Sequence, residues 1–478
     1  MNLIIKLLIS FYFDKNMYIN YGLKISLIFL FALFVNNSVA QQNSELFHIE
    51  NNILKGCDFQ KIPADGKVTI PYFVKVIEKE VFKNCSQLRF VEIPNTVEII
   101  EDNAFFNCVN LVSINIPDSV IRIGKNAFES CLNLTSVKFA ESLQVIEDEA
   151  FKSCYNIENM KLPKSVTSLG KGVFAECFNL KNVVISDKIS EIPHKAFYEC
   201  KSLKSIEIPS GVTRISASAF AFCESLASVK ISETVEYIGN DAFEQCKSLK
   251  YIHLPDSVKY LGASAFYGCS RLESVMLPRY LTHIKNDTFL DCHRLETIIF
   301  PEKLEKIGMH AFRKCQSIKH IKLPRTVTDI LFGAFNECVN LEEIKLSKVL
   351  SHIGSFAFAN CLNLKRINIP DLITDIGDKA FYDCKALAFV RLSRQTQVIG
   401  VQSFYGCSSL KTIKLPASVT KIGLEAFRGC SSLLEMRLNA VTPPEITRTI
   451  GYKGIIIVPK KSKEIYQENP LWKDNIFK

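Results

Sequence analysis

The sequence contains few of the elements from which catalytic sites are built. It has one tryptophan, six methionines and eight histidines in 478 residues. It has no G-x-S-x-G nucleophile motif, no phosphate-binding P-loop and no zinc-binding H-E-x-x-H motif. The histidines share no metal-ligand spacing, and no two cysteines have the C-x-x-C spacing of a zinc site. We therefore expect no enzyme activity, no cofactor and no bound metal.

A run of apolar residues long enough to span a membrane is also missing. The run at residues 25–35 has 11 residues, whereas a transmembrane helix needs about 20. It follows Lys24 and precedes Ser38-Val39-Ala40, which has the small-x-small pattern of a signal cleavage site. We predict a signal peptide at residues 1–40 and a secreted or cell-surface protein without a transmembrane span. A membrane anchor built from this run and residues 3–13 is the alternative.

Cysteine, by contrast, is abundant and strictly periodic. Sixteen of the 17 cysteines follow one another at intervals of 23 residues, from Cys85 to Cys430. Each of the sixteen has a phenylalanine three residues before it, from Phe82 to Phe427. A fixed period between about 20 and 50 residues is typical of a solenoid, in which each repeat contacts only its neighbours.

One repeat reads L-x-x-I-x-I-P-x-x-V-x-x-I-G-x-x-A-F-x-x-C-x-x, as in residues 111–133. Its alternating, β-branched I-x-I segment predicts a short strand, and the proline suits a strand end. We expect 17 such strands between Val68 and Leu438. The glycine, as in Gly124, is expected to permit a positive φ at a turn. The A-F-x-x-C segment is expected to form a short helical or irregular turn.

These residues resemble the BspA-like leucine-rich repeat family. The resemblance implies a right-handed α/β solenoid with a parallel sheet along one face. It also implies a secreted or surface-displayed interaction protein, with neither catalytic residues nor fixed partner residues to transfer. The expected domains are the signal peptide at 1–40, an N-terminal cap at 41–66, the solenoid at 67–438 and a C-terminal cap at 439–478. Trp472 is expected to cover the last coil.

The two periodic columns are interpreted as core. Phenylalanines beside small alanines fit rings that stack along the solenoid. Secretion would favour disulfides, but equivalent side chains of stacked coils point in the same direction rather than toward each other. We therefore predict that the sixteen cysteines are buried, reduced thiols, which behave as small apolar residues.

The central position of the I-x-I strand faces outward and carries an excess of positive charge. Eight of its sixteen residues are lysine or arginine, and only Glu92 and Glu207 are acidic. We call the group at its C-terminal end the basic row and take it as the candidate binding site: Lys322, Lys345, Arg391, Lys414 and Arg437. Glu343 and Glu435, two residues earlier in their strands, would neutralise it in part. A solvated face that only keeps the protein soluble is the alternative.

The function favoured by this pattern is recognition or adhesion outside the cell, through the solenoid face. The expected partner is an extracellular protein or an anionic glycan, and no nucleic acid is expected. The formal charge of +9 permits attraction to acidic partners without identifying one. The alternatives are a carbohydrate-active solenoid enzyme, which would need clustered carboxylates, and a purely structural surface protein.

Overall fold

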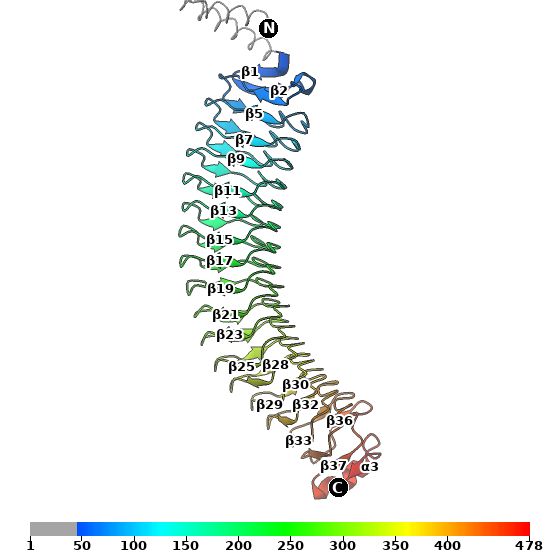
Figure 1. Cartoon of the computed structure of the whole chain (residues 1–478). Coiled ribbons are helices and arrows are strands. Elements are labelled where there is room, and N and C mark those ends of the chain that lie inside the picture. Colours follow the sequence, from blue (N-terminus) through cyan, green and yellow to red (C-terminus); the bar gives the residue numbers. More distant parts are fainter. Residues whose placement is uncertain (1–44) are drawn as a thin grey trace, which may run out of the picture.

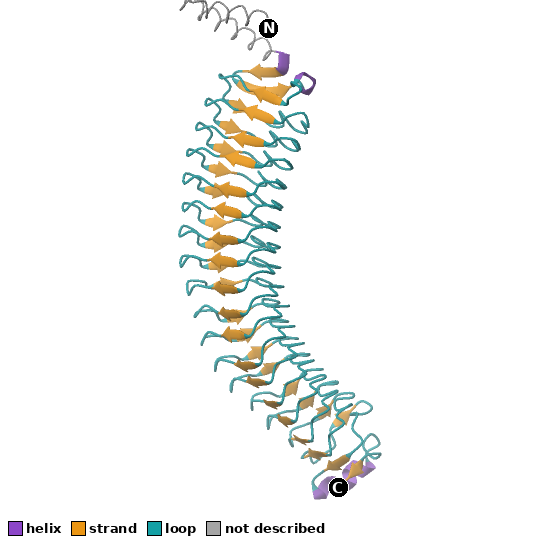
Figure 2. Cartoon of the chain, viewed as in Figure 1, coloured by secondary structure: helices purple, strands orange, loops and turns teal. Residues whose placement is uncertain are grey.

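The computed structural model describes residues 45–478, which form a long stack of coils with a gentle bend (Figure 1). Two ladders of parallel strands run along the stack, and turns join them (Figure 2). The predicted signal peptide, residues 1–40, lies outside the described residues, as do residues 41–44 of the predicted N-terminal cap.

The wide ladder consists of the predicted I-x-I strands. Successive strands pair in parallel with a shift of one repeat, as Val68 with Val91. The middle residue of each strand points inward and its two neighbours point outward, so the ladder has one buried and one exposed face. The prediction of 17 strands between Val68 and Leu438, all within the described residues, is confirmed. They are β3 (Lys67–Thr69), β5 (Phe90–Glu92), β7 (Ser113–Asn115), β9 (Ser136–Lys138), β11 (Asn159–Lys161), β13 (Asn182–Val184), β15 (Ser205–Glu207), β17 (Ser228–Lys230), β19 (Tyr251–His253), β21 (Ser274–Met276), β23 (Thr297–Ile299), β25 (His320–Lys322), β27 (Glu343–Lys345), β29 (Arg366–Asn368), β31 (Phe389–Arg391), β33 (Thr412–Leu415) and β35 (Glu435–Leu438).

The narrow ladder was not predicted. Its two-residue strands lie at the second apolar position of the repeat, just before the glycine column, and also pair in parallel one repeat apart. The second residue of nearly every strand is buried and belongs to the same core. They are β4 (Val76–Ile77), β6 (Ile99–Ile100), β8 (Arg122–Ile123), β10 (Val145–Ile146), β12 (Ser168–Leu169), β14 (Glu191–Ile192), β16 (Arg214–Ile215), β18 (Tyr237–Ile238), β20 (Tyr260–Leu261), β22 (His283–Ile284), β24 (Lys306–Ile307), β26 (Asp329–Ile330), β28 (His352–Ile353), β30 (Asp375–Ile376), β32 (Val398–Ile399), β34 (Lys421–Ile422) and β36 (Glu445–Ile446).

The α/β label needs correction, because the A-F-x-x-C segments form turns rather than helices. Between residues 47 and 478 the only α-helix is α3 (Lys463–Glu468). In the first repeat the amides of Glu80, Phe82 and Asn84 donate to carbonyls of the next coil at 2.8–3.1 Å. These amides are therefore not free for the i to i−4 bonds of a helix. The molecule is a β-solenoid, and its handedness stays a prediction.

The glycine column has a different purpose from the one predicted. Gly124 and Gly170 do not have a positive φ. A Cβ atom at Gly170 would lie 2.1 Å from the backbone nitrogen of Asp148 in the preceding coil, so glycine permits a close approach of two backbones. The positive φ values occur elsewhere in the turn, as at Asn126 (54°) and Ser130 (61°), which flank the A-F pair.

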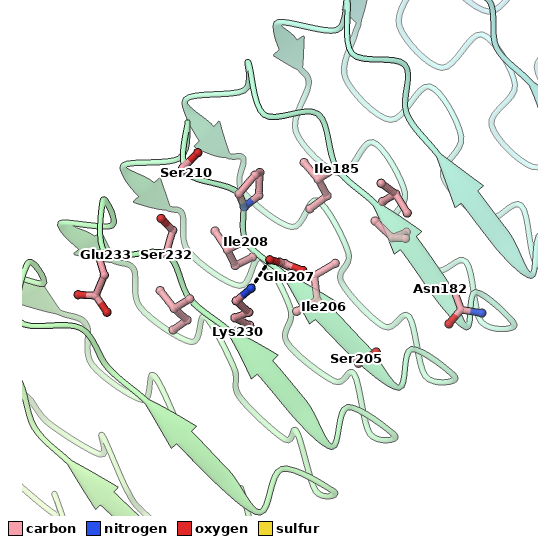
Figure 3. A pocket seen from close by; sticks show the side chains of 14 residues that line it. Asn182, Ile185, Ser205, Ile206, Glu207, Ile208, Ser210, Lys230, Ser232 and Glu233 are labelled. Atoms are coloured by element: carbon pink, nitrogen blue, oxygen red, sulfur yellow. Dashed lines mark hydrogen bonds and ion pairs between the residues drawn. The ribbon is translucent and has the colours of Figure 1, made fainter.

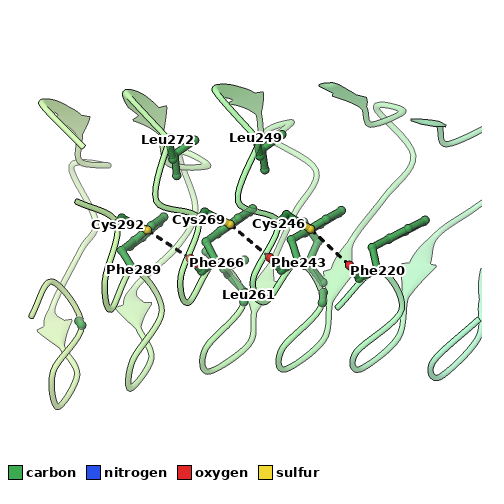
Figure 4. Packing of buried hydrophobic residues seen from close by; sticks show 14 of the residues in the cluster. Phe220, Phe243, Cys246, Leu249, Leu261, Phe266, Cys269, Leu272, Phe289 and Cys292 are labelled. Atoms are coloured by element: carbon green, nitrogen blue, oxygen red, sulfur yellow. Dashed lines mark hydrogen bonds between the residues drawn. The ribbon is translucent and has the colours of Figure 1, made fainter. Parts of the chain in front are cut away.

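Phenylalanine rings form a continuous stack through the core, as predicted (Figure 4). Phe243 is fully buried, and its ring centroid lies 5.4 Å from that of Phe220 and 5.5 Å from that of Phe266, with interplanar angles of 4°. The largest tilts, 21°, flank Phe174.

The cysteines form a second column beside the rings. All seventeen lie in the described part of the chain and are free thiols, and the sixteen periodic ones are buried. From Cys108 to Cys430, each Sγ donates to the carbonyl oxygen of the phenylalanine 26 residues earlier, as Cys246 to Phe220 at 3.3 Å (Figure 4). Burial raises the pKa of the Cys131 thiol from its ordinary value of 9.0 to about 12. The structure thus supports the interpretation of the column as buried thiols.

Phenylalanine stands at a strand end of the wide ladder in two places. Phe139 and Phe300 occupy a position where the other repeats have isoleucine or leucine. Phe139 packs edge-on against Phe151 at 5.6 Å, and Phe300 packs edge-on against Phe312 at 5.9 Å. The hydrogen-bonded sheet breaks after each of them, between β9 and β11 and between β23 and β25. It also breaks between β13 and β15, between β17 and β19 and between β31 and β33, where the equivalent position holds isoleucine or leucine.

Elements outside the repeats cover both ends of the stack. At the N-terminal end, β1 (Phe47–Glu50) and β2 (Ile53–Cys57) form an antiparallel pair, followed by the 3-10 turn η1 (Phe59–Lys61), and β2 pairs with β4. At the other end, β37 (Ile455–Ile457), η2 (Lys460–Ser462), α3 and β38 (Ile476–Phe477) follow the last repeat. There Trp472 is fully buried against Tyr466 and donates from Nε1 to the carbonyl of Pro444 at 2.9 Å.

Candidate binding face

The third residues of the wide strands β25, β27, β31, β33 and β35 place the basic row on the exposed face of the ladder. All five of its side chains are exposed. Lys322 pairs in register with Lys345, and Lys414 pairs with Arg437. Arg391 pairs with Asn368, the one uncharged residue in this stretch of the column. The hydrogen-bonded sheet is interrupted between β31 and β33, so the row extends over two sheets.

The cations of the basic row differ in their partners. Arg391 lies 3.5 Å from Asp371, and Arg437 lies 3.3 Å from Glu435. Within residues 45–478, no carboxylate oxygen lies within 4.0 Å of the Nζ atoms of Lys322, Lys345 or Lys414. Adjacent strands are about 4.8 Å apart, so Lys322 and Lys345 repel each other within one Debye length of about 8 Å, as do Lys414 and Arg437, whereas Lys414 lies three strands from Lys345. A bound anion would relieve that repulsion.

A further cation on this face escaped the sequence analysis. Arg366 is the first residue of β29 and is exposed, and it pairs in register with Glu343 on one side and Phe389 on the other. Arg366 lies two residues before the column of exposed positions from which the basic row was predicted. The same alternating pattern, read two residues earlier, would have found it.

A shallow cavity of about 780 Å³ lies on the same ladder, farther toward the N-terminus, over β13, β15 and β17 (Figure 3). Glu207 and Lys230 cross its floor as an ion pair of 2.5 Å, and Ser210, Ser232 and Glu233 lie at its edge. Glu207, one of the two acidic residues of the exposed column, is therefore neutralised by Lys230. None of the basic row lines this cavity.

The geometry of the repeats agrees with a comparison against known families. The family model described as "BspA type Leucine rich repeat region (6 copies)" matches residues 75–204, 190–319 and 305–434, which together span most of the chain. The chain belongs to the BspA-type leucine-rich repeat family. No match is found among curated proteins.

Solved structures of bacterial leucine-rich repeat proteins resemble this BspA-type chain. A leucine-rich repeat protein from Bacteroides ovatus is 28% identical with a TM-score of 0.54, and the match covers 90% of this chain and 96% of the other. A protein described as a leucine rich cell surface protein, from Faecalibacterium prausnitzii, is 27% identical with a TM-score of 0.41, covering 82% and 92%. The first of these likenesses supports the fold across nearly the whole chain.

Carboxylates with perturbed protonation lie away from the cavity of this BspA-type solenoid. Burial raises the pKa of both Asp241 and Glu244, and the charge of Asp241 raises that of Glu244 further. Neither residue lines the cavity over β13–β17. Within residues 45–478, no cluster of three or more histidine, cysteine, aspartate or glutamate side chains is suited to hold a metal ion.

The sequence predicts a chain without a transmembrane span. Among the helices that the structure describes, none has the length and apolar character needed to cross a membrane.

Proposed function

We propose that this BspA-type chain is a secreted or cell-surface recognition protein that acts without catalysis. It binds an anionic macromolecule, an acidic extracellular protein segment or a sulfated glycan, through the basic row. The observation that carries the proposal is the alignment of Lys322, Lys345 and Lys414 on one exposed face without carboxylate partners. The expected signal peptide and the family resemblance support a location outside the cell.

The strict repeat favours binding over catalysis. The strands pair at a constant interval of 23 residues, from Val68 with Val91 to Lys414 with Arg437. Specialised sites on solenoids are built from insertions on one face, and residues 67–438 contain none. What remains is an extended, rigid surface, which suits contact with a large partner.

Binding of a probe anion across a salt series tests the proposal. The probes are heparin, for a sulfated glycan, and poly-glutamate, for an acidic protein segment. The variant changes Lys322, Lys345 and Lys414 together to Ser, and the matched control removes the same charge elsewhere by changing Lys138, Lys161 and Lys164 to Ser. Three interactions of about 0.5–1 kcal/mol each predict at least about tenfold weaker binding for the first variant only.

The outcomes separate the proposed function from its alternatives. Salt-sensitive binding that only the basic-row variant loses supports the proposal, and the preferred probe identifies the class of partner. Equal weakening in both triple variants would show a nonspecific effect of net charge and would contradict a defined site. Absence of binding to either probe would favour a structural surface protein.

A further inference from the structure

An exposed apolar strip lies beside the basic row on the same face of the wide ladder. Met276 pairs in register with His253 on one side and with Ile299 on the other. Met276 is 47% exposed and Ile299 is 55% exposed. Tyr251 in β19 and Tyr280, in the turn after β21, extend the strip with exposed rings. We call these four side chains the apolar strip: Tyr251, Met276, Tyr280 and Ile299.

Several charged groups around the apolar strip are paired with one another. Glu273 accepts a hydrogen bond from the Tyr251 hydroxyl at 2.6 Å and lies 3.3 Å from Lys250. Arg279 and Asp256 form an ion pair of 2.7 Å beside Tyr280. The strip therefore combines exposed apolar side chains with a partly neutralised polar rim, in which Lys303, 5.1 Å from the Tyr280 ring centroid, forms no ion pair within residues 45–478. Surfaces of this kind in soluble proteins are characteristic of contacts with another protein.

The exposed column changes from apolar to positively charged residues at the coil after Ile299. Ile299 is followed along the column by Lys322 and then Lys345, neither of which has a carboxylate partner within residues 45–478. The hydrogen-bonded sheet is interrupted between β23 and β25, so Ile299 and Lys322 follow one another in the column without pairing in register. With coils at least about 4.8 Å apart, Met276 lies at least roughly 14 Å from Lys345 along the stack. An extended peptide advances about 3.3 Å per residue. A segment of about four residues therefore reaches from the apolar strip to both lysines.

We propose that a protein segment with apolar residues followed, within about two to four positions, by aspartate or glutamate docks on this junction. Its apolar side chains cover Met276 and Ile299, and its carboxylates pair with Lys322 and Lys345. This inference rests on the proposed function and narrows the partner to a protein. A sulfated glycan would satisfy the lysines but carries no apolar side chains to cover Met276 and Ile299.

Selection from a phage library of random 12-residue peptides, against the folded chain at physiological salt, tests the inference. We expect enrichment of peptides that combine an apolar block with an acidic block. Changing Met276 and Ile299 together to Ser should weaken the selected peptides at least about tenfold, the effect of losing about 1.4 kcal/mol. Changing Lys322 and Lys345 to Ser should have a similar effect, with a steep dependence on salt.

Matched controls remove equivalent side chains elsewhere on the same molecule. Changing the exposed Val349 and Leu372 to Ser controls for lost apolar surface. Changing Lys138 and Lys161 to Ser controls for lost charge at the same register position of the wide ladder. Both controls should bind the selected peptides as the wild type does. The far-UV circular dichroism and urea midpoint of every variant verify that it is folded.

Three results would overturn the inference: no enrichment, enrichment of peptides without an apolar block, or peptides that bind the Met276 and Ile299 variant unchanged. The heparin and poly-glutamate measurements separate this failure from failure of the proposed function. If the lysine variants lose those anions while the Met276 and Ile299 variant keeps every ligand, the basic row stands and the apolar strip is not part of the site.

Discussion

Raising the pH above about 9 should destabilise the protein steeply, because burial disfavours ionisation of the thiol column. Burial raises the pKa of every interior cysteine from Cys108 to Cys407 above the ordinary value of 9.0. In the unfolded chain these thiols would lose their protons near pH 9. Because the folded state holds the protons more tightly, the thiols favour folding below pH 9, and this contribution is lost as the pH rises above it.

The magnitude follows from the number of thiols. At pH 9 each of these fourteen cysteines favours the unfolded state by RT ln 2, about 0.4 kcal/mol, which sums to about 6 kcal/mol. At pH 10 the sum is about 20 kcal/mol, comparable with the lower end of the roughly 20–65 kcal/mol that about 0.05–0.15 kcal/mol per residue gives for residues 45–478. Near pH 9 the slope of stability against pH should be about −10 kcal/mol per pH unit.

Urea denaturation under reducing conditions between pH 7 and pH 10 measures this dependence. Far-UV circular dichroism follows the strands, and thiolate absorbance in the ultraviolet follows ionisation of the cysteines. The two signals should change together, in one narrow interval above pH 9. Thiolate absorbance that rises while the circular dichroism stays native would refute the reasoning, as would a urea midpoint that stays constant up to pH 10.

Two predictions concern the stability of the core, and both are read from urea midpoints. Phe243→Ala removes a fully buried ring from the stack and should lower the free energy of unfolding by about 3–5 kcal/mol. Phe389→Ala, at an exposed site, should lower it by less than about 0.5 kcal/mol. Equal urea midpoints for the two variants would show that the stack is not core. Gly170→Ala places a Cβ atom 2.1 Å from a backbone nitrogen and should separate two coils. It should lower the free energy of unfolding more than Gly172→Ala, which incurs only the left-handed penalty of about 1–2 kcal/mol at φ 59°. The reverse order of the two urea midpoints would contradict the close-approach explanation.

The wide ladder could be predicted from the sequence, whereas the narrow ladder could not. Residues such as Val91 and Glu92 alternate between apolar and polar, and this alternation defines a strand with one buried face. A strand such as β8, with only Arg122 and Ile123, is too short to show a period. Its existence depends on hydrogen bonds to neighbouring coils, which periodicity within one repeat does not reveal.

The positions of the positive φ values could not be predicted either, because they too depend on contacts between coils. A glycine does not always indicate a positive φ. Gly124 is required because a Cβ atom there would lie 2.6 Å from the backbone nitrogen of Asp102 in the preceding coil. The left-handed positions are occupied mostly by asparagine, serine and acidic residues, such as Asn126 and Glu149, which give no comparable signal in the sequence. Hydrogen bonds to the next coil hold these residues in place, as Asn126 donates to the carbonyl of Asp148 at 2.9 Å.

The basic row itself followed from one rule, that residues at equivalent positions of successive repeats lie side by side. The register of Lys322 with Lys345 and of Lys414 with Arg437 bears this out. What the rule could not supply is which cations are already neutralised, because Asp371, the partner of Arg391, lies in a turn of the preceding coil. The role of the basic row as a binding site stays a prediction.

Covalent footprinting of the complex tests the central claim most directly. The folded chain, with and without its tightest selected peptide, is treated with a lysine-acylating reagent and with an oxidant of methionine, and the modified fragments are quantified by mass spectrometry. The account predicts protection of Lys322, Lys345 and Met276 on binding, and unchanged labelling of Lys138 and Lys161 on the same ladder. Protection of Lys138 and Lys161 with full labelling of Lys322, Lys345 and Met276 would contradict it.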